Sequence, residues 1–134
     1  MIKPQNTVIW IASIFCIVLG QDKNYNDFQE GLSLERSGKI EEAIVIYKEI
    51  LNNAPDHQPS FFQLKNIYYN RSKNKDGIEV VIKWLANKST DLQSMLLLSE
   101  FYFRDSNERE ARKIWAQFEN CLLYTSDAAD EVVR

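Results

Sequence analysis

Cysteine and histidine are scarce in this chain. Its 134 residues include two cysteines and a single histidine, His57. Residues 21–120 contain no cysteine, which excludes disulfides, thiol nucleophiles and cysteine metal sites from that segment. Acid–base catalysis by His57 would need a second group that orients the imidazole, and no sequence feature supplies one. We therefore expect His57 to be a loop residue in water.

Catalytic motifs and a strong charge bias are also missing. The sequence contains no G-x-S-x-G, no H-E-x-x-H and no glycine-rich phosphate loop. The net charge of −3 gives no reason to expect nucleic acid or an anionic membrane as a partner. Composition is that of a soluble globular protein, with 45% hydrophobic and 26% charged residues. We expect neither an enzyme nor a bound cofactor or metal.

The first twenty residues have the pattern of a secretory signal peptide. Lys3 precedes an uncharged, apolar run from Val8 to Leu19, and the small residues Val18 and Gly20 precede Gln21. The run is shorter than the roughly 20 residues of a transmembrane helix. An uncleaved N-terminal anchor is the alternative. We expect an exported protein, most consistent with a bacterial periplasm or cell envelope.

The last fourteen residues, CLLYTSDAADEVVR, differ in style from the rest. The stretch CLLYTSDAADE resembles the in-frame translation of a transposase adapter used to prepare sequencing libraries. We therefore treat residues 121–134 as a non-native tail, and expect the natural chain to continue past Asn120. A natural frayed terminus is the alternative.

A repeat of 34 residues organises the segment between these ends. Its clearest copy is Gly31–Pro55, in which a helix end, a Ser37-Gly38 break and a second amphipathic helix follow one another. Small residues recur at Ala43, Gly77 and Ala111. Other positions align at the same spacing: Gly31, Lys65 and Ser99; Leu34, Tyr68 and Tyr102; Tyr47, Val81 and Trp115; Ile50, Trp84 and Phe118.

These positions resemble the tetratricopeptide repeat, a 34-residue helix pair with small residues at the helix contacts. The resemblance implies an all-α fold, a right-handed α-solenoid of three helix pairs. The pairs would occupy 24–57, 58–91 and 92–120. The second copy is degenerate, because Lys65 replaces a residue that is usually small and Ser89 stands where proline is usual. The third copy is truncated.

The apolar periodicity predicts six helices. We place them at Tyr25–Ser37, Ile40–Asn53, Pro59–Arg71, Asp76–Asn87, Asp91–Arg104 and Glu108–Asn120, within about 2–4 residues at each end. Either Thr90 or Asp91 can cap the fifth helix. Because helix pairs bury their apolar faces by stacking, we expect the last pair to expose Ile114, Trp115 and Phe118.

The resemblance also implies a binding surface, because in this family the first helix of each pair lines a concave groove. The residues carried over to that groove are Phe28, Phe62, Asn66, Tyr69, Glu100, Phe103 and Arg104, within a wider set that adds Leu32, Glu35, Asn70 and Leu96. The family's carboxylate-clamp subtype uses Lys, Asn and Arg at such places, and only Asn66 and Arg104 fit it. Alternatively, several of the aromatic residues pack between neighbouring repeats.

These observations predict a scaffold that binds a protein or peptide segment in an aromatic, largely apolar groove. Two alternatives remain open from the sequence. The repeats are an accessory domain of a larger envelope enzyme or assembly factor, or they stack between copies in a self-assembling structure.

Overall fold

The computed structural model describes residues 23–131, and the side chains of residues 23–123. Every regular element in the described range is an α-helix, which confirms the all-α prediction. None of these helices is both long enough and apolar enough to span a bilayer. The expected signal peptide at residues 1–20 lies outside the described residues.

Contacts divide the chain into two compact units, with residues 23–54 of the described range in the first and 55–131 in the second. The first unit is one helix pair: a helix at residues 23–36 and α2 (Ile40–Asn53). Gly31 lets the two helices approach closely, because a Cβ there would lie 2.5 Å from Cε1 of Tyr47. Tyr47 is fully buried, and its hydroxyl donates to the carboxylate of Glu35 at 2.8 Å.

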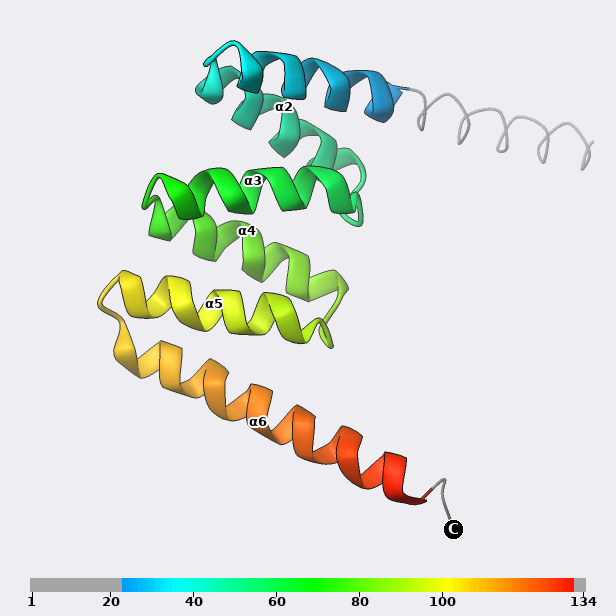
Figure 1. The fold of residues 1–134 in the computed structure, drawn as a ribbon, viewed down its shortest axis with the longest axis vertical. Coiled ribbons are helices and arrows are strands. Elements are labelled where there is room, and N and C mark those ends of the chain that lie inside the picture. The colour runs from blue at the N-terminus through cyan, green and yellow to red at the C-terminus, as the bar shows by residue number, and fades with distance from the viewer. Residues whose placement is uncertain (1–22, 132–134) are drawn as a thin grey trace, which may run out of the picture. The chain divides into compact units, whose positions relative to one another are not determined.

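The second unit contains two helix pairs in succession, in which each helix packs against the next (Figure 1). They are α3 (Gln58–Asn70), α4 (Asn74–Asn87), α5 (Leu92–Arg104) and α6 (Glu108–Glu131). In each of α3 and α5, apolar residues three positions apart form a buried ridge. The ridge residues are Phe61, Leu64 and Ile67 on α3, and Met95, Leu98 and Phe101 on α5. This consecutive packing of helix-turn-helix units is that of an α-solenoid.

The turn inside each pair repeats the same backbone geometry. Gly38, Ser72 and Ser106 have positive φ angles of 80°, 54° and 61°. In the first turn Lys39 N–H donates to the Leu34 carbonyl at 2.9 Å, and the other two turns have the equivalent bond. This is the Schellman ending, which usually places glycine at the left-handed position. The spacing of these residues, 34 positions, reproduces the sequence repeat.

Two helices of the second unit, α3 and α5, begin at a side-chain cap. Asp91 accepts from the Ser94 amide at 3.2 Å, so Asp91 rather than Thr90 caps α5. It also accepts from Trp84 Nε1 at 2.8 Å. Burial alone would raise the pKa of Asp91, but these hydrogen bonds outweigh it and lower the pKa. The same carboxylate therefore starts α5 and ties it to α4.

His57 is more than a loop residue in water, which corrects the expectation from the sequence. It is half-buried and caps α3, with Nδ1 accepting from the Ser60 amide at 3.3 Å and lying 2.9 Å from the Ser60 hydroxyl. Only the neutral imidazole has a lone pair on Nδ1 for this amide. The sequence did contain a signal for this cap, because His57 lies 34 positions before Asp91, which caps the first helix of the next pair.

We expect the stability of the fold to fall below neutral pH through His57. Burial lowers the pKa of its imidazole, although the Asp56 carboxylate acts in the opposite direction. The unfolded chain then binds the proton more tightly, so the contribution of this cap is complete above about pH 7 and is lost as the pH falls from about 6.5 through the lowered pKa. Urea unfolding across this range, with His57→Asn as a cap that does not titrate, measures the effect. Parallel pH profiles for the two proteins would contradict it.

The sixth helix is longer than the sequence prediction. It was expected to end at Asn120, but α6 continues to Glu131. The boundary was wrong because we set residues 121–134 aside, although no glycine or proline follows Gly77 to stop a helix.

Candidate binding surfaces

Three of the predicted groove residues lie along one side of α3. Phe62, Asn66 and Tyr69 are spaced by four and three positions, which places them on one helix face. Half of the Phe62 surface (51%) is exposed, and the Lys65 ammonium lies 4.6 Å from the centre of its ring. Asn66 and Tyr69 are half-buried. This side of α3 thus offers an open aromatic ring next to polar groups.

Tyr69 joins α3 to α5. Its hydroxyl donates to Glu100 at 2.5 Å, and this bond is the main reason that the pKa of Tyr69 is raised. The Arg104 guanidinium lies 4.3 Å from the centre of the Tyr69 ring. It also donates to the Tyr69 carbonyl at 3.3 Å and to the Ser72 hydroxyl at 3.4 Å. The structure therefore brings Tyr69 together with Glu100 and Arg104, which follow it by 31 and 35 positions.

We call Phe62, Asn66, Tyr69, Glu100 and Arg104 the α3/α5 face. Its charged groups are partly engaged within the protein, since Arg104 holds a carbonyl and a hydroxyl and Glu100 holds a phenol. Glu100 nevertheless remains exposed. An arginine held in this way is poorly placed to clamp a peptide carboxylate, which argues further against the carboxylate-clamp subtype.

Phe28 belongs to the first unit and is described there. It is half-buried, and its ring lies 5.8 Å from that of Tyr47, centre to centre. Phe28 thus packs against Tyr47 within its own helix pair, which differs from both the groove position and the packing between repeats considered from the sequence.

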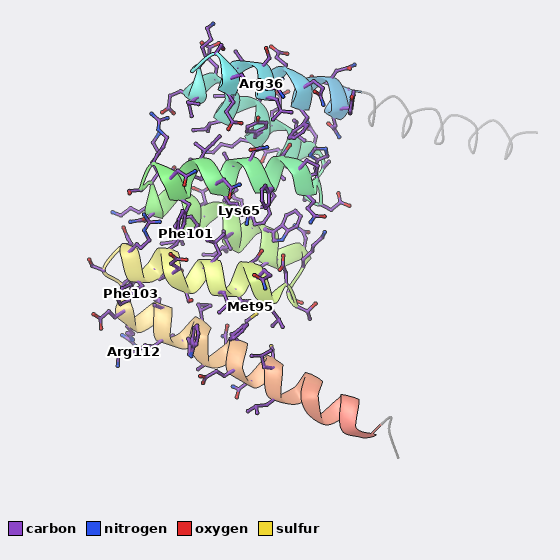
Figure 2. All side chains as sticks on the ribbon, viewed as in Figure 1. Arg36, Lys65, Met95, Phe101, Phe103 and Arg112 are labelled. Atoms are coloured by element: carbon purple, nitrogen blue, oxygen red, sulfur yellow. The ribbon has the colours of Figure 1, made fainter. Side chains whose placement is uncertain are left out.

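Phe103 lies on a different surface from its predicted neighbours. A helix turns about 100° per residue, so Phe103 projects away from Arg104 and toward α6. It is 65% exposed and lines a groove of about 280 Å³ between α5 and α6. Figure 2 shows it near the end of α5, with Arg112 near the start of α6. We call this the terminal groove; its lining residues are Ser99, Phe103, Glu108, Ala111, Arg112 and Trp115.

The sequence predicted exposed apolar surface here, but no groove. Trp115 is 48% exposed, as expected, whereas Ile114 and Phe118 are half-buried. The signal for the groove was present in the alignment of Ala111 and Trp115 with Gly77 and Val81, both of which are buried. It was missed because spacing alone does not say whether a helix covers these positions.

Within residues 23–123 the side chains form no cluster of three or more groups that would hold a metal ion. The chain matches no protein-family model and no curated protein. The two surfaces just described are therefore interpreted from their own geometry.

Proposed function

We propose that the chain is a tetratricopeptide-type scaffold that binds a peptide segment of another protein on the α3/α5 face. The observation that carries the proposal is that the exposed Phe62 ring lies on the same face of α3 as Tyr69, which contacts Glu100 and Arg104 of α5. The repeat spacing and the three Schellman turns at 34-residue intervals support the family assignment. The apolar run at Val8–Leu19 supports export to a periplasm or envelope as the setting.

The chemistry of this face suggests what kind of segment it takes. Exposed aromatic rings are common anchors in protein interfaces, where they are surrounded by polar groups. Phe62 would receive an apolar side chain. Asn66 offers both amide donors and a carbonyl acceptor, and Glu100 offers an acceptor to backbone N–H groups or to a basic side chain. A peptide that combines an apolar anchor with a basic residue fits this arrangement.

A peptide library displayed on phage and selected on the immobilised chain tests the proposal. We expect enriched peptides to share an apolar residue and a Lys or Arg. Phe62→Ala should weaken their binding by about tenfold or more, since a buried aromatic anchor contributes at least about 1.4 kcal/mol. Glu100→Gln should weaken peptides that carry the basic residue more than peptides that lack it.

The matched control is Ile82→Ala, which removes an exposed apolar side chain from α4 of the same unit. It should leave peptide affinity unchanged. Equal binding to the parent chain, the Phe62 variant and the Ile82 variant would place the peptide elsewhere and reject the proposal. So would a selection that enriches no peptide.

A further inference from the structure

Glu100 and Arg104 lie four positions apart on α5, with the acid nearer the N-terminus. On a helix this spacing and order favour an ion pair. Glu79 and Lys83 on α4 have the same spacing and form one at 2.7 Å. The Glu100 carboxylate instead accepts from the Tyr69 hydroxyl at 2.5 Å, and it makes no ion pair with the basic groups that the structure describes. The acid on α5 is therefore held by a neutral phenol.

The Arg104 side chain is turned toward α3. Its guanidinium donates to the Tyr69 carbonyl at 3.3 Å and to the Ser72 hydroxyl at 3.4 Å. Both distances exceed the range of about 2.7–3.2 Å that is usual for N–H···O bonds. A bond to a carboxylate would be charge-assisted and therefore stronger. A carboxylate within reach of Arg104 would thus compete with these two bonds.

The Tyr69 ring is held on two sides. It meets the Phe101 ring edge-on, with ring centres 5.9 Å apart, and Phe101 is itself fully buried against Gly77 of α4. Figure 2 labels Phe101 on α5. The Arg104 guanidinium lies over the Tyr69 ring, 4.3 Å from its centre. Because the ring is fixed in this way, its hydroxyl directs the Glu100 carboxylate to one place.

The charges of this face are therefore separated. The Lys65 ammonium lies over the Phe62 ring, and the Arg104 guanidinium lies over the Tyr69 ring. The Glu100 side chain is exposed, and Oε1 is the oxygen that accepts from Tyr69. A carboxylate has a second oxygen and further lone pairs, which remain for a ligand. The side chain that complements an exposed carboxylate is a lysine or an arginine.

We propose that Tyr69 is a positioning residue: its hydroxyl holds the Glu100 carboxylate away from Arg104, so that Glu100 selects a basic side chain in the bound segment. The inference rests on the function proposed above and names the residue that sets its specificity. Without the phenol, Glu100 pairs with Arg104 along α5, and its charge is neutralised before a ligand arrives. Tyr69 thus acts through Glu100.

The probes are the peptides with a Lys or Arg that the phage selection described above enriches. Each is paired with a copy in which norleucine replaces the basic residue, which keeps an apolar stem and removes the charge. In fluorescence anisotropy with the parent chain, the basic peptide should bind about tenfold more tightly than its copy. Tyr69→Phe keeps the ring, removes the hydroxyl and should reduce this ratio to about twofold. It should leave the affinity of the norleucine copy unchanged, whereas damage to the fold would weaken both peptides.

A second substitution distinguishes positioning from a structural role. Arg104→Gln removes the competing cation, so in the Tyr69→Phe background it should restore the ratio to about fivefold or more. Glu100→Gln should abolish the discrimination in every background. Tyr102→Phe is the matched control, because it removes the hydroxyl of another half-buried tyrosine of the same unit, on α5. It should leave the ratio unchanged.

Two results would overturn the inference and leave the proposed function in place. One is a ratio that Tyr69→Phe does not change, and the other is a loss in Tyr69→Phe that Arg104→Gln does not recover. A selection that enriches only peptides without Lys or Arg would also reject the inference, while the apolar anchor at Phe62 would stand. Failure of the proposed function has a different signature, since it appears as equal binding to the parent chain and the Phe62→Ala variant.

Discussion

Replacing Trp84 by alanine is expected to destabilise the protein by about 3–5 kcal/mol. The indole is 4% exposed and stacks face to face on Phe61, with ring centres 4.1 Å apart and planes 3° apart. Its Nε1 donates to Asp91, which caps α5, and the Lys88 ammonium lies 4.5 Å from its ring centre. The substitution removes a large buried side chain and a bond between two helices. Urea unfolding followed by circular dichroism measures the loss.

Two variants separate the contributions of packing and hydrogen bonding. Trp84→Phe retains an aromatic ring but loses the indole donor, and should cost about 1–2 kcal/mol. Phe118→Ala is the matched control, because Phe118 is the aligned position on α6 and is half-buried. It should cost about 1 kcal/mol. If Phe118→Ala were as destabilising as Trp84→Ala, the conclusion that Phe118 is less buried than Trp84 would be wrong.

Phe101→Ala is expected to have an effect of similar size, about 3–5 kcal/mol. The ring is fully buried against Gly77, and glycine has no side chain that could fill part of the cavity left by the substitution. Phe103→Ala, two positions along the same helix, is the control. Phe103 is 65% exposed, so its loss should change stability by only about 0.5 kcal/mol.

The same unfolding experiment compares these two variants. Equal losses at positions 101 and 103 would mean that the Phe103 ring is covered in solution, which would also remove the terminal groove as an open surface. A small loss of stability from Phe101→Ala would mean that the packing of Phe101 against Gly77 contributes little to holding α5 against α4.

The agreement between sequence and structure is closest where the signal is local. The second helix was predicted at Ile40–Asn53 and lies there, because an apolar stripe, two acidic residues in its first turn and the Gly38 break all act within that stretch. The burial of Ala43 and Tyr47 follows from the same stripe. The binding residues were harder to place. Tyr69, Glu100 and Arg104 were all named in advance, but their contact with one another depends on how α5 packs beside α3.

The sequence by itself determined the helix pairs and their period, because hydrophobic spacing and turn residues act over a few positions. Only the tertiary structure decided which apolar positions are covered. Val81 and Trp115 occupy the same place in the repeat, yet α5 lies against α4, and the aligned face of α6 is left partly open within the described residues. It likewise separated Phe103 from Arg104, because the direction of a side chain matters only once a neighbouring helix is in place. The periodicity of a repeat gives the apolar face of each helix. Whether that face is buried depends on which helix packs against it.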